Sequence, residues 1–304
     1  MKEMNDLLQY CAERYEQIKC ENCAYNETFS QICKHECYSC LFKIHRVCNH
    51  SDHYCCERIL YRYVLKFQIR YASEMARCFW HIFNEQNVII PITVCSLGCG
   101  PASELYGLFW IAKYLSIPAE NIIYKGFDID NKWKIINDKS LSFFIGQNVE
   151  FIYSDMFQYV SEKNINMDIL VLNYVLSDCM RYDKSKANTI VDNIYQMIVS
   201  ERVKSIIIND IALFYTDEEN KSAYTCMLDL EKKLVDNNIS VSIIKKRFAE
   251  PKTTTVEPYG DLSKKNSIMF NIPSNIIQYS PFSLCDSIIL IIQKKQSHDT
   301  KCKS

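Results

Sequence analysis

The sequence predicts an α/β fold, in which a doubly wound, seven-stranded sheet follows a small and mostly helical module. Short apolar runs and helical patterns alternate from about residue 91 onward, as is typical of strands connected by helices. The runs are apolar at almost every position, which is expected for parallel strands covered on both faces. The first 90 residues contain neither glycine nor proline, and this composition favours helices.

We expect the 304 residues to form three parts: a cysteine-rich helical module over 1–90, an α/β domain over 91–293 and a flexible, lysine-rich tail over 294–304. In the first part, apolar side chains recur at helical spacing from Leu7 to Ile18, and a longer helical pattern follows. The longer helices are expected at 57–83, 104–115 and 187–198. The strands are expected at 92–97, 122–127, 149–153, 169–173, 205–209, 240–244 and 287–292.

Charge and hydropathy narrow the functional classes. The chain has 35 basic and 36 acidic residues, which argues against a strongly charged partner at the level of the whole chain. Its N-terminal segment lacks an apolar run of signal-peptide length, and the apolar runs elsewhere are too short to span a bilayer. We therefore expect a cytoplasmic protein without a membrane partner.

Cysteine is concentrated near the N-terminus, because nine of the sixteen cysteines lie in the first 56 residues. In a reducing compartment, clustered cysteines indicate metal binding before disulfides. The pairs Cys20/Cys23 and Cys37/Cys40 have the spacing of a tetrahedral zinc site. A second grouping, with His45 and Cys56 beside Cys37 and Cys40, is also sterically reasonable, and two metals are possible. The alternatives are buried thiols and a structural iron–sulfur cluster.

A glycine turn follows the first expected strand. Gly98 and Gly100 stand between that strand and the next helix, where glycines permit a sharp turn and close approach of a ligand to the backbone. Asp128 ends the second strand, at a position suited to the hydroxyls of a ribose. After the third strand, Asp155 can accept the amino group of an adenine, and Met156 or Phe157 can cover the ring.

These strand ends together resemble the class I S-adenosylmethionine-dependent methyltransferases, over about residues 91–293. The resemblance implies a Rossmann-like sheet of seven strands with an antiparallel last strand. Ser96 and Ala102 depart from the family pattern, which often has an acid and a glycine there. More narrowly, the chain looks like a branch with cysteine-rich N-terminal extensions. The cofactor-binding residues that follow from this resemblance are Leu97, Gly98, Gly100, Asp128, Ile129, Asp155, Met156 and Asn173.

The end of the fourth strand is the expected position of the methyl acceptor. Asn173 could hydrogen-bond the acceptor and Asp178 could remove its proton, with Tyr174 between them as a third candidate catalytic residue. The alternative for Asp178 is that it only caps the next helix. The sequence therefore predicts an S-adenosylmethionine-dependent methyltransferase whose zinc module aids folding and recognition of a small-molecule or protein substrate.

Two other functions remain open at this stage. The first is an RNA methyltransferase that contacts phosphates through a basic stripe, Arg58, Arg62, Lys66 and Arg70, at four-residue spacing along the long helix. The competing interpretation of this stripe is the solvated face of an amphipathic helix. The second is a non-catalytic, zinc-binding interaction protein built on a methyltransferase scaffold.

Overall fold

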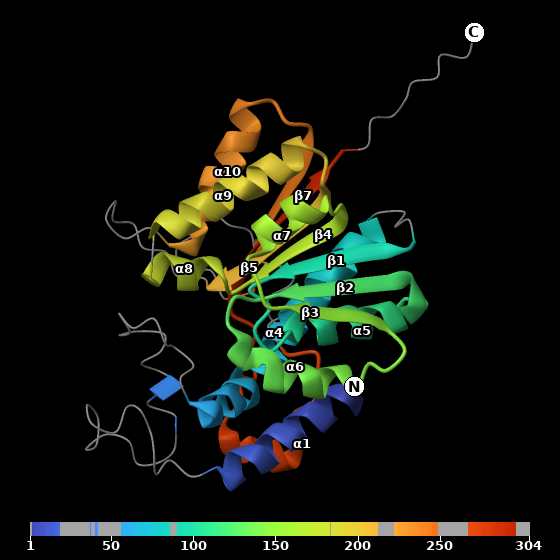
Figure 1. The fold of residues 1–304 in the computed structure, drawn as a ribbon, viewed down its shortest axis with the longest axis vertical. Helices are drawn as coiled ribbons and strands as arrows, with labels where there is room; N and C mark the ends of the chain where they lie inside the picture. Colours follow the sequence, from blue (N-terminus) through green and yellow to red (C-terminus); the bar gives the residue numbers. More distant parts are fainter. Residues whose placement is uncertain are drawn as a thin grey trace.

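A single seven-stranded sheet forms the centre of the protein in the computed structural model (Figure 1). The residues described are 2–18, 37, 40–41, 56–85, 90–182, 184–211, 222–248 and 267–295. The sheet has the strand order β3-β2-β1-β4-β5-β7-β6. Its strands are β1 (Ile92–Leu97), β2 (Ile122–Phe127), β3 (Asn148–Ile152), β4 (Met167–Asn173), β5 (Val203–Ile211), β6 (Val241–Arg247) and β7 (Ser287–Lys294).

The pairing of the strands confirms the expected fold class. Strands β1 to β5 are parallel, and β7 runs antiparallel between β5 and β6. The strand order reverses between β1 and β4, and in open parallel sheets ligands bind in the crevice at such a switch point. All seven strands lie within about two residues of their expected positions, except that β6 extends three residues further. Lys294, expected in the tail, ends β7.

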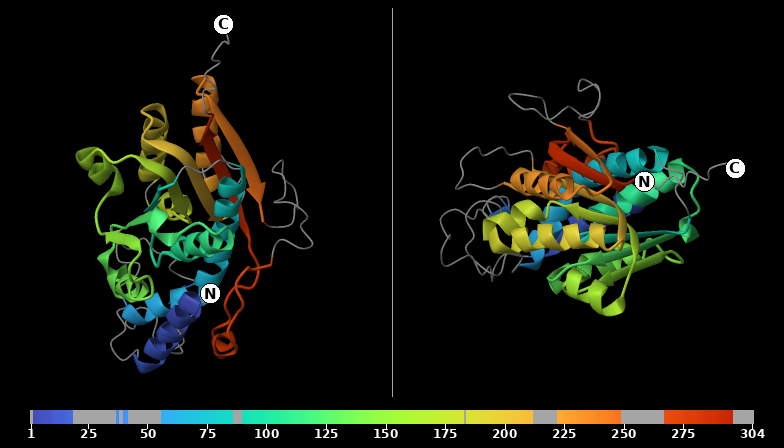
Figure 2. Two further views of the ribbon diagram at one scale, coloured as in Figure 1. Left: turned by 90° about the vertical axis from the view of Figure 1, so that its right-hand side faces the viewer. Right: turned by 90° about the horizontal axis from the view of Figure 1, so that it is seen from above.

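Two helical layers cover the sheet (Figure 2). One buried cluster joins the sheet to α1 (Lys2–Gln17), α4 (Glu57–Glu85), α5 (Ser103–Tyr114) and α6 (Lys134–Leu141). The other cluster joins the opposite face to α7 (Met156–Lys163), α8 (Leu176–Tyr182), α9 (Lys184–Val199) and α10 (Ala223–Asp236). The 3-10 turns are η2 (Ala119–Asn121), η3 (Asn131–Trp133) and η4 (Ser274–Tyr279). None of the described helices is long and apolar enough to cross a membrane.

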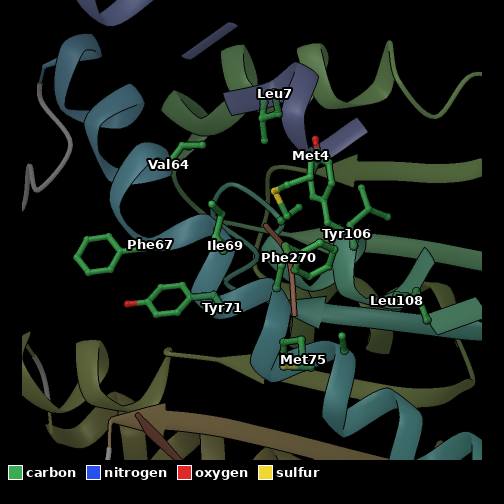
Figure 3. Packing of buried hydrophobic residues seen from close by; sticks show 14 of the residues in the cluster. Met4, Leu7, Val64, Phe67, Ile69, Tyr71, Met75, Tyr106, Leu108 and Phe270 are labelled. Atoms are coloured by element: carbon green, nitrogen blue, oxygen red, sulfur yellow. The ribbon is translucent and has the colours of Figure 1, made fainter. Parts of the chain in front are cut away.

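The N-terminal helices pack directly on the α/β part of the chain. Met4 and Leu7 of α1, Met75 of α4 and Tyr106 of α5 belong to one buried cluster (Figure 3). The contact between α4 and α5 is close, because a Cβ atom added at Gly107 would meet the carbonyl oxygen of Ala72 at 2.6 Å. The helices before residue 90 thus share a hydrophobic core with the sheet.

The basic stripe of α4 is turned into the protein. Arg62 is buried and donates to the carbonyl of Tyr279, and Lys66 donates to the carbonyl of Ser280. Arg70 is buried among polar partners described below, and Arg58 donates to the carbonyl of Tyr15. Arg62 and Arg70 are therefore shielded from solvent, while Arg58 and Lys66 are half-buried. An RNA contact through the whole stripe is therefore not favoured, because its side chains bind groups within the protein.

The expected metal ligands fall mostly outside the described residues. Cys20, Cys23 and His45 are not among them, while Cys37 is buried and Cys40 and Cys56 are half-buried. Within the described part of the chain, no group of three or more His, Cys, Asp or Glu side chains could hold a metal ion. The zinc site therefore stays a prediction.

Candidate functional site

The turn between β1 and α5 is shaped by three residues in the left-handed region. Gly98 has a φ of 62°, Gly100 of 49° and Ala102 of 54°. A Cβ atom added at Gly98 would lie 3.0 Å from the side chain of Val175, so the turn closely approaches the end of β4. Ala102 adopts the conformation that the missing glycine would favour, at a cost of about 1 kcal/mol. The turn therefore keeps its shape despite the departure from the family pattern.

Asp128 joins the end of β2 to this turn. One carboxylate oxygen accepts the N–H of Gly100 at 2.8 Å, and the other accepts the N–H of Asp130 at 2.8 Å. Each oxygen has a second lone pair that could accept a ligand hydroxyl. Burial raises the pKa of Asp128 to about 6, and the two backbone hydrogen bonds only partly oppose this shift.

The end of β3 provides the next part of the site. Asp155 caps α7 by accepting the N–H of Gln158 at 3.0 Å. The side chain of Met156 is buried in the core, whereas Phe157 is only half-buried. Ile129, after β2, is 77% exposed although it is a large apolar residue. Ile129 and Phe157 are thus the accessible apolar side chains available to a flat ring here.

At the end of β4, Asn173 lies in a polar network that runs into the core. Its amide nitrogen donates to the hydroxyl of Ser103 at 3.1 Å, and its oxygen accepts from Asn209 at 2.8 Å. Asn209 also donates to Glu74 of α4 and accepts from Ser287 of β7. Asn173 is therefore held in one orientation by its neighbours from α5 and β5.

Tyr174 is held by the same network. Its φ is 62°, and its hydroxyl donates to Glu74 at 2.9 Å and accepts from Arg70 at 2.8 Å. Burial raises the pKa of Tyr174 well above its ordinary value, although the nearby Arg70 opposes the shift. A phenol in this environment stays protonated, so the geometry suits Tyr174 to a positioning role better than to that of a base.

Asp178 lies in the first turn of α8, at the edge of the same site. The start of α8 is bound from another element, because Asp210 of β5 accepts the N–H of Ser177 at 3.0 Å. Burial raises the pKa of Asp210 to about 6.

The strand ends surround one cavity of about 1260 Å³. Every residue expected to bind cofactor or acceptor lines it: Leu97, Gly98, Gly100, Asp128, Ile129, Asp155, Met156, Asn173, Tyr174 and Asp178. Tyr63 and Tyr71 of α4 and Trp133 of η3 also line it, and none of them was among the residues expected to bind cofactor or acceptor. The available signal was the four-residue spacing of Tyr63, Phe67 and Tyr71, which a core stripe also explains.

Glu104 is a further residue that was not expected at the site. It is buried in the first turn of α5 and accepts the hydroxyl of Tyr124 at 2.6 Å. Burial raises the pKa of Glu104, while hydrogen bonds that include the one from Tyr124 oppose the rise. An acid thus lies beside the glycine turn although position 96 is a serine.

No protein-family model and no curated protein matches the chain. Among solved structures, it is similar to the plantazolicin methyltransferase BpumL in complex with SAH, at 11% identity over 94% of this chain and 100% of that chain, with a TM-score of 0.43. It is similar to an rRNA methylase from Streptococcus thermophilus at 15% identity, covering 73% and 96%, with a TM-score of 0.42. An O-methyltransferase family protein from Burkholderia thailandensis has 11% identity, covering 79% and 60%, with a TM-score of 0.45.

These identities and TM-scores are low, and they do not establish the function of this chain. The fold itself follows from the arrangement of the strands: five parallel strands, an antiparallel β7 and a switch point between β1 and β4. This is the Rossmann-like sheet that the resemblance to class I methyltransferases implies.

Proposed function

We propose that this protein transfers a methyl group from S-adenosylmethionine to an acceptor. The observation that supports this most is that the glycine turn and the ends of β2, β3 and β4 line one cavity at the switch point of the sheet. A nucleoside joined to an amino acid needs contacts of these kinds from neighbouring strands.

The residues present fit this cofactor. The left-handed turn at Gly98 and Gly100 exposes backbone without side chains, which suits close approach of the methionine part. Asp128 has lone pairs left for the ribose hydroxyls, and Ile129 and Phe157 can cover the adenine. When bound, the cofactor supplies a methyl group on a positively charged sulfur.

The chain's own residues then have to orient the acceptor and take its proton. Asn173, fixed between Ser103 and Asn209, is suited to hydrogen-bond the acceptor. Asp178 lines the cavity and is the candidate base. Tyr174 supports the wall of the cavity through its contacts with Arg70 and Glu74.

Calorimetry with S-adenosylhomocysteine tests the cofactor site directly. The wild-type chain should bind it, and Asp128→Ala should weaken binding by about 10- to 100-fold, since it removes an acceptor of charge-assisted hydrogen bonds. Asp192→Ala is the matched control, because Asp192 lies on α9 in an exposed ion pair with Lys233. No heat with the wild type would contradict the proposal, and binding without any methyl transfer would favour the non-catalytic alternative.

The zinc module is part of the same proposal, on the cysteine spacing in the sequence. Cys20, Cys23, Cys37 and Cys40, or Cys37, Cys40, His45 and Cys56, would hold the ion. Elemental analysis of the purified chain should give one or two equivalents of zinc, and Cys37→Ser should lower both zinc content and stability. Anaerobically purified protein without metal would contradict this part alone.

A further inference from the structure

The cavity has a second wall, built mainly by α4. Tyr63 and Tyr71 both line the cavity and lie two turns apart on one face of the helix, with Phe67 between them. The ring centroids of Tyr63 and Phe67 are 4.7 Å apart, and those of Phe67 and Tyr71 are 5.4 Å apart. Trp133 lies 5.3 Å from Tyr63 at one end, and Tyr174 lies 3.9 Å from Tyr71 at the other. We call these five residues the aromatic wall; all of them except Phe67 line the cavity.

Tyr71 presents a limited part of its side chain to the cavity. Its ring is nearly parallel to that of Phe67, at 17°, and to that of Tyr174, at 23°, so these neighbours cover the ring faces. Phe67 and Tyr71 project from the side of α4 opposite to Met4 and Tyr106 (Figure 3). Within the described part of the chain, the Tyr71 hydroxyl makes no hydrogen bond. The cavity therefore meets chiefly the edge of the ring and its hydroxyl.

The charges around this wall do not favour a polyanion. The arginines Arg62 and Arg70 of α4 are used in contacts within the protein. The lysines that line the cavity, Lys132 and Lys186, come from η3 and α9. Asp178 lines the same cavity as Tyr71. Burial raises the pKa of the Tyr71 hydroxyl well above its usual value, and Tyr63 and the carboxylate of Glu74 add to the rise, while Arg70 opposes it. Tyr71 thus stays protonated and can donate a hydrogen bond in a cavity that the Asp178 carboxylate also lines.

We infer that the aromatic wall binds the methyl acceptor, and that the acceptor is a small, planar aromatic molecule with a hydroxyl group. This inference rests on the proposed methyl transfer. Aromatic ring edges carry partial positive charge and favour the negative face of another aromatic ring over a saturated one. Tyr71 then donates a hydrogen bond to the acceptor, in the cavity that Asp178 also lines.

The reaction balances with these groups alone. The acceptor oxygen forms a bond to the methyl carbon, and the bond between that carbon and the sulfur breaks. The electron pair stays on the sulfur, so S-adenosylhomocysteine leaves as a neutral thioether. The proton of the acceptor hydroxyl passes to the Asp178 carboxylate and from there to water.

Calorimetry on the full-length chain saturated with S-adenosylhomocysteine tests the inference with two probes of similar shape, 2-naphthol and its saturated analogue decahydro-2-naphthol. We expect 2-naphthol to bind about tenfold more tightly than the saturated probe, since aromatic contacts are lost in the latter. Tyr71→Ala should remove most of this preference. Tyr71→Phe, which keeps the ring and the stack, should weaken 2-naphthol about fivefold by removing the hydroxyl.

Two controls separate this inference from loss of folding and from the proposed function. Tyr114→Ala changes an exposed tyrosine at the end of α5 and should leave both probes unaffected. Each variant should keep the wild-type affinity for S-adenosylhomocysteine, which shows that it is folded. Equal binding of the two probes, insensitivity to both Tyr71 variants, or labelled methyl transfer into RNA alone would overturn the inference. Absence of S-adenosylhomocysteine binding would instead overturn the proposed function.

Discussion

Two side chains near the switch point, those of Asp128 and Tyr174, have different roles although burial acts on both. Asp128 and Tyr174 both have raised pKa values because burial disfavours their charged forms. The pKa of Asp128 rises only to about 6, so it is ionised at neutral pH. The pKa of Tyr174 rises well above the already high value of a phenol, so its hydroxyl stays neutral. One residue can therefore bind hydroxyls as an anion, while the other can only support the wall.

Cofactor binding should depend on pH through Asp128. Since the free protein loses the Asp128 charge as pH falls through about 6, we expect the affinity for S-adenosylhomocysteine to fall about tenfold between pH 7 and pH 5. The same shift makes the free energy of unfolding decrease as pH rises from about 4 to about 6, because the folded state binds this proton more tightly than the unfolded state.

Calorimetric titrations at several pH values would measure this dependence. Asp128→Asn is the matched variant, since it keeps the shape of the side chain and cannot titrate. Its affinity should be lower and nearly constant between pH 5 and pH 7. The same slope in the variant and the wild type would show that another group controls binding.

Helix α4 is the element that connects the N-terminal part to the site. One of its faces packs on α5, its basic residues bind α1 and the segment around η4, and Tyr63 and Tyr71 line the cavity. Its carboxylate Glu74 is fully buried and accepts hydrogen bonds from Arg70, Tyr174, Asn209 and the backbone of Asp286. A helix that occupies three surfaces at once tolerates few substitutions.

Gly107→Ala should destabilise the protein, although alanine is the better helix former. The added Cβ atom would meet the carbonyl oxygen of Ala72 at 2.6 Å and the backbone nitrogen of Ala76 at 2.8 Å. Because neither backbone atom can move without shifting α4, we expect a loss of about 1–3 kcal/mol in unfolding free energy. Urea denaturation would measure it. An unchanged or increased stability would show that α4 and α5 are not packed this closely.

Glu74→Gln should destabilise the protein by about 3 kcal/mol, because it leaves the guanidinium of Arg70 buried beside an uncharged partner. In the wild type, the two side chains lie 3.1 Å apart and are 11% and 0% exposed. Glu162→Gln on α7 is the matched control, since this exposed carboxylate accepts only from Gln158 among the described residues. Its effect should stay within about 0.5 kcal/mol. Similar melting temperatures for the two variants would contradict the prediction.

At the scale of the whole molecule, the described helices before residue 90 share one buried cluster with the sheet. Met4, Met75, Tyr106 and Ile291 belong to α1, α4, α5 and β7, and all four lie in this cluster. Removal of either part would expose a large apolar surface of the other. A division at residue 90 into two modules stays a prediction, and the packing makes cooperative unfolding the expected behaviour.

Differential scanning calorimetry of the full-length chain should therefore show a single unfolding transition, with calorimetric and van't Hoff enthalpies in agreement. S-adenosylhomocysteine should raise its midpoint, since the ligand binds the folded state. Two resolved transitions, of which only one responds to S-adenosylhomocysteine, would show that residues 1–90 unfold independently.

The positions of the strands, the residues at their ends and the place of the cavity at those ends could all be predicted from the sequence. Continuous apolar runs and the short segments after them are local features, so the residues at Gly98, Asp128, Asp155 and Asn173 could be found without a structure. The departure at Ala102 could not be assessed in this way, because only the backbone shows that it adopts the glycine conformation.

Tertiary structure alone decided what α4 does. Helical spacing places Arg62, Lys66 and Arg70 on one face, but it does not indicate whether that face meets water or the segment around η4, more than 200 residues away. The same periodicity describes Tyr63 and Tyr71 equally well as core or as cavity lining. The difference depends on long-range packing, which brings Tyr71 of α4 against Tyr174 after β4 and gives the site its aromatic wall.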